Sequence, residues 1–123
     1  MMNWIQISDE LEIMQDPVME VDFGITNPMP MPARGITYKK AEEWSKSHAF
    51  RLPTDEEWLL GWRKMNHWGL WEWTSTKQCD DYKLRGGSWY DLPLFDRVAY
   101  RIDFEPKDRF DFIGFRCVRG IVI

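Results

Sequence analysis

The chain has 123 residues, with 16 Lys and Arg against 20 Asp and Glu, and 44% of its residues are hydrophobic, eight of them tryptophan. A chain of this length buries about two thirds of its unfolded surface around one core, so we expect a single ordered domain over residues 1–123. The net charge of -4, without a basic cluster, argues against binding to a phosphate backbone, and no nucleic-acid partner is expected.

The N-terminal segment is not expected to act as a targeting signal. The opening MMNWIQISDELEIMQ lacks a basic region followed by an apolar one. A membrane span needs about 18 consecutive apolar residues, and no run in the sequence approaches that length. We therefore expect no signal peptide, no membrane insertion, and synthesis in the cytoplasm.

Short apolar bursts near the N-terminus predict strands at Trp4–Ile7, Leu11–Ile13 and Val18–Phe23, where the helical signal is weak. The following segment, Asn27–Pro32, carries three alternating prolines. Because proline removes backbone donors and favours extended geometry, this segment is expected to be a connecting loop.

Two helices are predicted in the middle of the chain. Thr37 can cap a helix that continues to about Lys46. Thr54 and Glu57 match a capping box, in which each side chain accepts a hydrogen bond from the other residue's backbone amide. The apolar side chains that follow at helical spacing, and that should face the core, are Trp58, Trp62 and Met65.

Beyond Asn66 the pattern changes to short strands separated by irregular connections. These strands are predicted around Trp71–Thr74, Leu84–Arg85, Val98–Ile102 and Ile113–Val118. The whole pattern is that of an α+β domain with much irregular loop.

The cysteines and histidines do not form a recognisable metal or disulfide pattern. Two cysteines, Cys79 and Cys117, are too few for a disulfide framework, and His48 and His67 lie at no ligand spacing, so no metal site is predicted. Cys117 lies in an apolar run and is expected to be a small buried core residue. The sequence leaves open whether the two sulfurs are bonded.

Four blocks of the sequence resemble, in order, the signature blocks of the formylglycine-generating-enzyme (sulfatase-modifying factor) domain. They are Arg51–Trp58, Gly69–Thr74, Leu84–Trp89 and Ile113–Val118. The resemblance implies a C-type-lectin-like fold of the formylglycine-generating-enzyme type, with two helices, a small twisted antiparallel sheet and much irregular loop.

The resemblance also allows a test for catalysis. Enzymes of this family hold copper with a cysteine pair shortly after the Gly-Gly-Ser block, and here Asp91 and Asp96 stand in those places. Carboxylates are poor ligands for soft copper(I), so no enzymatic activity, catalytic residue or cofactor is expected. The histidine-rich motif of related iron enzymes is absent, and Gly69–Leu70 replaces the Asn-Val that commonly supplies a calcium ligand.

The C-terminal part is most like the variable proteins of diversity-generating retroelements. The shared motifs are Gly86–Trp89, Arg97–Arg101 and Ile113–Arg116. In such proteins a reverse transcriptase corrupts template adenines, so AAC codons become other codons ending in C, which never encode Lys, Glu, Gln, Met or Trp. The window from Tyr90 to Phe112 contains two such residues, Glu105 and Lys107, against about six expected from the chain's composition.

The resemblance thus implies a variable ligand-binding region over residues 86–116. Its side chains mix large apolar and acidic types without a strand or helix period, as in antibody loops. The candidate ligand-binding residues are Tyr90, Asp91, Leu94, Phe95, Asp96, Tyr100, Ile102, Asp103, Phe104, Asp108, Phe110, Asp111 and Phe112.

Fixed residues around this window are expected to hold it in place. They comprise glycines where a side chain would obstruct the backbone, buried aromatic anchors, and arginines whose donor forks bind backbone carbonyls. These residues are Gly86 and Gly87, Trp89 and Phe115, and Arg97, Arg101 and Arg116.

The sequence therefore predicts a non-catalytic receptor-binding protein, virion-associated or displayed on a surface. Its expected ligand is a protein or glycan on a host or neighbouring cell. One alternative is a degenerate or altered enzyme of the formylglycine-generating type. Another is that the window is an ordinary aromatic-rich loop packed on the domain. A calcium-dependent lectin is disfavoured because no Glu-Pro-Asn type motif occurs.

Overall fold

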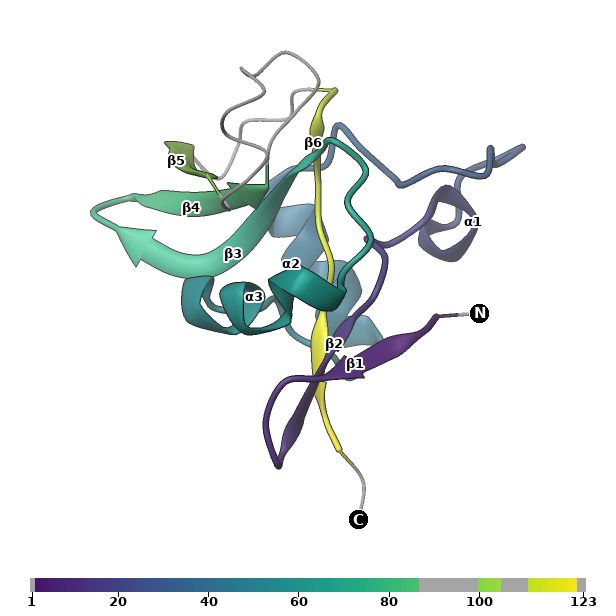
Figure 1. The fold of residues 1–123 in the computed structure, drawn as a ribbon. Coiled ribbons are helices and arrows are strands. Elements are labelled where there is room, and N and C mark those ends of the chain that lie inside the picture. Colours follow the sequence, from purple (N-terminus) through teal and green to yellow (C-terminus); the bar gives the residue numbers. More distant parts are fainter. Residues whose placement is uncertain (1, 87–99, 105–110, 122–123) are drawn as a thin grey trace.

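The computed structural model describes residues 2–86, 100–104 and 111–121. Within them the chain forms an α+β fold of short helices and two small sheets (Figure 1). The helices are α1 (Glu20–Phe23), α2 (Tyr38–Ser47), α3 (Asp55–Gly61) and the 3-10 helix η1 (Trp62–Lys64). The strands are β1 (Trp4–Gln6), β2 (Leu11–Met14), β3 (Trp71–Gln78), β4 (Asp81–Gly86), β5 (Tyr100–Phe104), β6 (Ile113–Gly114) and β7 (Val118–Gly120).

The first sheet joins the two ends of the described chain. Its strand order is β1-β2-β7, and both pairings are antiparallel. Ile13 of β2 lies opposite Ile5 of β1 and also opposite Val118 of β7. These three residues pack with Trp58 and Met65 into one core cluster, so α3 and η1 are fixed against this sheet.

The second sheet has the order β5-β4-β3-β6. β3 and β4 form an antiparallel hairpin, β5 adds antiparallel to β4, and β6 adds parallel to β3. The sheet is therefore mixed: β5, β4 and β3 are antiparallel, as the resemblance implies, and β6 is parallel to β3. A second core cluster around Trp71, Trp73 and Phe115 packs this sheet against α2, and α3 packs against β3 and β4 (Figure 1).

Both predicted helix starts are confirmed. The Thr37 hydroxyl accepts a hydrogen bond from the Lys40 amide at 3.2 Å and caps α2. At α3, the Thr54 hydroxyl accepts from the Glu57 amide at 3.2 Å, and the Glu57 carboxylate accepts from the Thr54 amide at 2.9 Å. This is the reciprocal capping box that the sequence predicted.

The predicted apolar stripe after Thr54 is confirmed in part. Trp58 and Met65 are buried, but Trp62 is half-buried and already belongs to η1. The α-helix ends at Gly61, where an added Cβ would lie 2.8 Å from the Ile13 side chain. The close approach of β2 at this point explains why glycine closes the helix.

The strand predicted at Val18–Phe23 is wrong: Glu20–Phe23 form the short helix α1, and before it Met19 makes an isolated β-bridge to Pro32. Val21 is 64% exposed, so the apolar bursts here do not mark a buried strand face. The helix is closed by Gly24, whose left-handed backbone (φ 92°) lets the amides of Gly24 and Ile25 donate to the Glu20 carbonyl. The structure thus has a third α-helix beyond the two predicted.

The single strand predicted at Ile113–Val118 is also wrong, because the structure has two separate strands there. β6 ends at Gly114 and joins the second sheet, whereas β7 begins at Val118 and joins the first. Phe115 and Cys117, between the two strands, are fully buried. The segment crosses the core from one sheet to the other, which explains its apolar character.

Among the described residues, no helix has the length and apolar character needed to span a bilayer. Cys79 and Cys117 are both free thiols; Cys79 is exposed at the β3–β4 turn, and Cys117 is buried as predicted.

Candidate functional site

The chain lies beside Trp71 both before and after the candidate ligand-binding residues. In the second sheet, Trp71 of β3 has Gly86, the last residue of β4, on one side and Ile113, the first residue of β6, on the other. The Trp71 amide also donates to the Phe112 carbonyl at 2.9 Å. We call Trp71, Gly86 and Ile113 the Trp71 junction. The chain leaves this junction after Gly86 and returns to it at Phe112.

Most of the predicted ligand-binding residues lie outside the described residues. These are Tyr90, Asp91, Leu94, Phe95, Asp96, Asp108 and Phe110. The predicted framework residues Gly87, Trp89 and Arg97 also lie outside them.

Four predicted binding residues lie in strand β5. They are Tyr100, Ile102, Asp103 and Phe104. β5 pairs with β4 in an unbroken register that runs from Tyr82 opposite Phe104 to Gly86 opposite Tyr100. The strand predicted around Val98–Ile102 is confirmed for residues 100–102, whereas residues 98 and 99 lie outside the described residues.

The last two predicted binding residues differ from each other. Asp111 is exposed in the turn before β6, whereas Phe112 is half-buried and packs against the core cluster around Trp71. Phe112 thus contributes to the core as well as to the return of the chain. Its position next to Ile113, the first fully buried residue of β6, is the sequence signal for this role.

Gly86 fulfils the predicted need for a residue without a side chain. Its φ is 105°, and an added Cβ would lie 2.4 Å from the Leu70 carbonyl oxygen. No ordinary side chain fits at that distance from a backbone oxygen. The β4 backbone therefore passes directly against the residue that precedes Trp71.

A buried ion pair lies directly beside the junction. Glu72, 2% exposed, follows Trp71 in β3, and Arg116 is fully buried two residues after β6. The Arg116 Nε donates to Glu72 Oε1 at 2.5 Å, and Nη2 donates to Oε2 at 2.8 Å. The Trp58 indole N–H also donates to Glu72 Oε1, at 2.9 Å, so that α3 is tied to the same carboxylate.

The rest of the Arg116 guanidinium binds backbone carbonyls. Nη1 donates to Met14 at 3.0 Å and Gln15 at 2.7 Å, and Nη2 donates to Asn66 at 3.0 Å. With the two bonds to Glu72, all five guanidinium N–H groups have acceptors. The predicted tethering role of Arg116 is confirmed, and it joins β2, the segment after η1, and β3.

The sequence did not reveal Glu72 as the partner of Arg116. Glu72 stands between two tryptophans in Gly69–Thr74, and a carboxylate within such an apolar block was the available signal. Because charged residues are almost never fully buried unless paired, that pattern calls for a buried cation nearby.

A second ion pair lies on the neighbouring strand. Arg85 of β4 donates to both carboxylate oxygens of Asp55, with Nε at 2.5 Å from Oδ1 and Nη2 at 3.1 Å from Oδ2. Both side chains are nearly buried. The pair connects the first turn of α3 to the strand that ends at Gly86.

The two cysteines occupy very different environments. Cys117 Sγ lies 3.1 Å from the Ser45 hydroxyl, and burial raises the pKa of this thiol to about 12, partly opposed by the Ser45 hydrogen bond. Cys79 lies at the turn that joins Gln78 to Asp81, at the opposite end of the hairpin from the Trp71–Gly86 pair.

The histidines take part in local contacts. His48 stacks on Trp44 with ring centroids 3.8 Å apart, and its Nδ1 lies 2.8 Å from the Trp44 carbonyl. His67 Nε2 lies 2.8 Å from the Trp62 carbonyl. Within residues 2–86, 100–104 and 111–121, no three His, Cys, Asp or Glu side chains gather into a metal-binding group.

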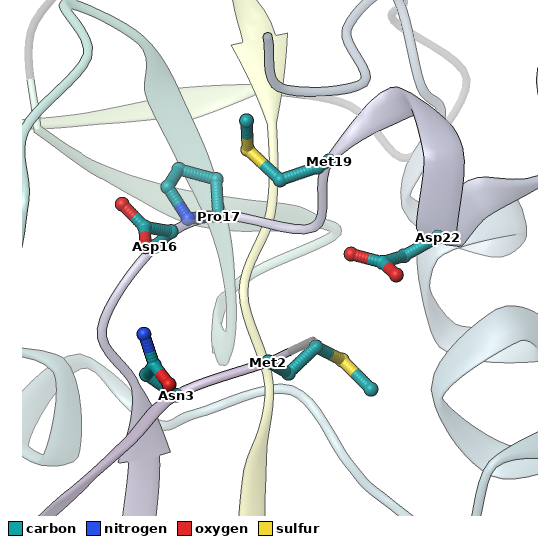
Figure 2. A pocket seen from close by; sticks show the side chains of 6 residues that line it. All are labelled: Met2, Asn3, Asp16, Pro17, Met19 and Asp22. Carbon is teal, nitrogen blue, oxygen red and sulfur yellow. The ribbon is translucent and has the colours of Figure 1, made fainter. Parts of the chain in front are cut away.

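A small pocket lies away from the junction, between the N-terminal strand and α1 (Figure 2). Its volume is about 30 Å³, far below that of ligand pockets, and it holds at most one or two waters. Asp16 at its edge already accepts hydrogen bonds from Asn66 and Trp68. The pocket is lined by Met2, Asn3, Asp16, Pro17, Met19 and Asp22.

The helices, the β3–β4 hairpin and the C-terminal strands form an α+β domain. In it the buried Glu72–Arg116 ion pair lies beside the Trp71 junction of the second sheet. Residues 61–121 match the family model of the sulfatase-modifying factor enzyme 1-like domain. The match runs from the end of α3 through β7 and includes the Trp71 junction, Glu72 and Arg116. It supports a C-type-lectin-like domain of the formylglycine-generating-enzyme type. A search of curated proteins finds no significant match.

Proposed function

We propose that this protein is a non-catalytic ligand-binding protein, a variable protein of a diversity-generating retroelement. In this proposal the candidate positions between Tyr90 and Phe112, within a variable region of residues 86–116, present interchangeable side chains on a fixed lectin-like scaffold. The observation that carries it is the Trp71 junction, because the chain pairs with one residue of β3 both before the candidate positions, at Gly86, and after them, at Ile113. Binding residues are commonly placed on loops that a rigid scaffold positions.

The buried polar groups support this role. Glu72, next to Trp71, is held by Arg116 and Trp58, and Arg85 in β4 is held by Asp55. These contacts come from residues outside the proposed variable positions. Side chains in the window could therefore change while the supporting contacts persist.

The cysteines support the absence of copper chemistry. Asp91 and Asp96 replace the expected thiols. Cys117 is buried, hydrogen-bonded to Ser45 and has a raised pKa, so it does not offer a ready thiolate. We propose that incubation with copper and a sulfatase-type cysteine peptide leaves the peptide unmodified, whereas turnover to an aldehyde would contradict the proposal.

The proposed ligand is a protein or glycan on a host or neighbouring cell, bound by a virion-associated or surface-displayed form of this chain. Aromatic side chains would supply contact area at low rotamer cost, and aspartates would supply hydrogen-bond acceptors. No nucleic-acid partner is proposed, because the chain has a net charge of -4.

The decisive test is the neighbouring DNA. The proposal requires a near-repeat of the codons for residues 86–116 that differs chiefly at adenines and lies beside a reverse-transcriptase gene. If the flanking DNA contains neither, the variable-protein assignment is wrong and the altered-enzyme alternative regains weight.

A second test separates folding from binding. A variant with Tyr90, Asp91, Phe95, Asp96 and Asp108 changed to Ser or Asn should melt within a few degrees of the parent, since surface changes cost less than about 0.5 kcal/mol each. It should lose the signal that the parent gives on arrays of cell-surface glycans and host surface proteins.

The matched controls come from the described residues. Asp111→Asn, at an exposed position, should leave the melting temperature unchanged, whereas Phe112→Ala should lower it because Phe112 packs on the core. Cooperative unfolding of the multiple variant at much lower temperature would show that the window builds the core instead.

A further inference from the structure

The two sheets have four outer edges, and the chain covers two of them with its own backbone. Beside β7, Arg51 and Val118 exchange two backbone hydrogen bonds, at 3.1 and 2.8 Å. Beside β6, the Ile36 amide donates to the Ile113 carbonyl at 3.4 Å. Covering an edge in this way prevents another strand from pairing with it.

The other two edges are the outer sides of β1 and β5. In the described part of the chain, no strand or isolated bridge pairs with either of them. β1 has three residues, whereas β5 has five, so β5 is the longer unpaired edge. Figure 1 shows β5 at the margin of the second sheet, beside β4.

The alternation of hydrogen bonds in β4 shows which way the backbone of β5 faces. The Lys83 carbonyl accepts from the Thr74 hydroxyl of β3 at 2.8 Å, so the Lys83 backbone faces β3. Successive residues of a strand direct their N–H and C=O groups to opposite sides, so Leu84 faces β5. Ile102 lies opposite Leu84, and these two residues therefore form a hydrogen-bonded pair.

The Trp71 junction gives the same alternation. The Trp71 amide donates to Phe112, on the β6 side, so Gly86, which lies opposite Trp71, faces β5. The residues of β5 that lie between the hydrogen-bonded positions are Arg101 and Asp103. Their N–H and C=O groups therefore point away from β4, toward the outer edge.

We propose that the ligand contains an extended protein segment whose backbone pairs with the outer edge of β5, as a fifth strand of the second sheet. This strand pairing rests on the proposed function, because β5 carries four of the candidate variable positions, and it narrows the ligand from a protein or glycan to a protein. The outward N–H and C=O groups lie two residues apart, about 7 Å along the strand, which is the spacing that the backbone of another strand matches.

Pairing through the backbone keeps part of the affinity while the side chains change. Every residue type except proline brings the same N–H and C=O groups. In strand addition these groups supply affinity, and the side chains supply specificity. Diversification of β5 would therefore change which segment binds without removing the edge on which it lies.

The test uses the full chain and linear peptides selected on it from a random library. Amide hydrogen exchange, followed by NMR, locates the contact. In the free protein the amides of Arg101 and Asp103 should exchange quickly and those of Ile102 and Phe104 slowly, because only the latter two bond to β4. A bound peptide should slow the exchange at Arg101 and Asp103.

Methylated peptides test whether the backbone of the ligand takes part. N-methylation removes one donor of the peptide, and a backbone hydrogen bond is worth about a factor of ten in affinity. Methylation at every second position should therefore weaken binding about tenfold per position, whereas methylation at the positions between them should have little effect. Peptides that bind through side chains alone would show no such alternation.

A pair of protein variants tests the β5 side of the contact. Asp103→Ala and Asp103→Pro both remove the carboxylate, but only proline removes the outward N–H. Asp103→Pro should bind the peptides about tenfold more weakly than Asp103→Ala. The two should melt at similar temperatures, because an edge strand tolerates a proline at a position whose N–H would face outward. Ile102→Pro should melt lower, because the Ile102 N–H bonds to β4.

The matched control is Gln6→Pro in β1. The Ile7 amide donates to Leu11, on the β2 side, so the Gln6 N–H faces the outer edge of the first sheet. This variant removes an outward donor from the other unpaired edge and should bind the peptides like the parent.

Three results would overturn strand pairing at β5. They are a library that yields no peptide, a bound peptide that leaves the exchange at Arg101 and Asp103 unchanged, and equal binding by Asp103→Pro and Asp103→Ala. If a cell-surface ligand needs the variable side chains but leaves that exchange unchanged, the strand pairing is wrong and the proposed function stands. If peptides pair with β5 and the flanking DNA holds no template repeat, the strand pairing stands and the proposed function is wrong.

Discussion

Two arginine–glutamate pairs in this protein have similar hydrogen-bond geometry and opposite surroundings. Arg51 donates to both oxygens of Glu57 at 2.7 Å, and Arg116 donates to both oxygens of Glu72 at 2.5 and 2.8 Å. The Arg51 side chain is 49% exposed, whereas that of Arg116 is fully buried. The difference lies in what each pair connects.

The exposed pair is local. Arg51 and Glu57 are six residues apart, and Glu57 also completes the capping box of α3. The Arg51 hydrogen bond is the main cause that lowers the pKa of Glu57. Water competes for the Arg51 guanidinium, which is 49% exposed, so such a pair stabilises the fold little.

The buried pair is long-range. Arg116 and Glu72 are 44 residues apart, and their contacts reach β2, β3, α3 and the segment after η1. Removing two charges from water carries a desolvation cost, which a full set of hydrogen bonds offsets. The comparison teaches that the position of an ion pair, more than its geometry, decides its structural role.

The largest expected effect breaks the buried pair. Arg116→Met should cost about 3–5 kcal/mol, because Glu72 would remain as a buried, uncompensated carboxylate. Arg51→Met should cost less than about 1 kcal/mol. Urea unfolding of both variants measures the contrast, and similar losses for the two would contradict it. Glu72→Leu combined with Arg116→Met should recover part of the loss, because no charge stays buried.

Trp58 gives the next largest effect. Trp58→Ala should cost about 3–5 kcal/mol, since the side chain is fully buried. Trp58→Phe keeps most of the packing but removes the N–H donor to Glu72, and should cost about 1–3 kcal/mol. Trp62→Ala, at the half-buried position one turn later, is the matched control and should cost less than Trp58→Ala. A loss below about 1 kcal/mol for Trp58→Ala would be inconsistent with its place in the core.

Gly86 and Gly24 allow a comparison of backbone strain with and without a steric clash. Both have positive φ, 105° and 92°, but an added Cβ meets the Leu70 carbonyl at Gly86 and nothing within 4 Å at Gly24. Gly24→Ala should cost about 1–2 kcal/mol from the left-handed backbone alone. Gly86→Ala should cost more, because β4 must move away from Leu70. Thermal melts of the two variants measure this difference, and equal losses would show that the close approach is unimportant.

The smallest effect concerns the thiols. The folded pKa of Cys117 is about 12 against an ordinary 9.0, so the unfolded chain loses this proton first as pH rises. Stability should therefore fall above about pH 9, by up to about 1.4 kcal/mol per pH unit, and the fall should be shallower in Cys117→Ala. Burial, together with Tyr82 and Glu42, also raises the pKa of Tyr38. The pH dependence with and without Cys117→Ala should therefore be measured in proteins that both carry Tyr38→Phe, so that Tyr38 does not contribute to it.

Thiol labelling checks the same contrast directly. The exposed Cys79 should react with a thiol reagent at pH 8 in the folded protein, while the buried Cys117 should react only after unfolding. Rapid labelling of both cysteines in the folded state would contradict the burial of Cys117.

Features fixed by nearby residues were predictable from the sequence. The capping box at Thr54 and the cap at Thr37 depend on residues within three positions, so local pattern sufficed. α1 was missed because its four residues include β-formers, and the tertiary bond from the Glu20 amide to Met31 helps to fix it. The break after Gly114 was missed because a continuous apolar run does not show that its two halves join different sheets.

The position of the candidate site could be predicted from the sequence better than the contacts that hold it. The motif glycine Gly86 and the tether Arg116 were found from their residue types and motif setting. The Glu72 partner was missed because a contact across 44 residues leaves no sequence period. The core role of Phe112 was missed for the same reason, since it depends on the return of the chain to β3.

The Trp71 junction also has a consequence for the number of residues that can connect Gly86 to Ile113. Because these residues flank one residue of β3, their separation is set by two strand spacings, about 10 Å, whatever the connecting length. Loop-closure entropy grows only logarithmically, so doubling a flexible connection costs about 0.6 kcal/mol. The fold can therefore accommodate insertions and deletions in this part of the chain, as well as substitutions, without moving the points at which it enters and leaves the sheet.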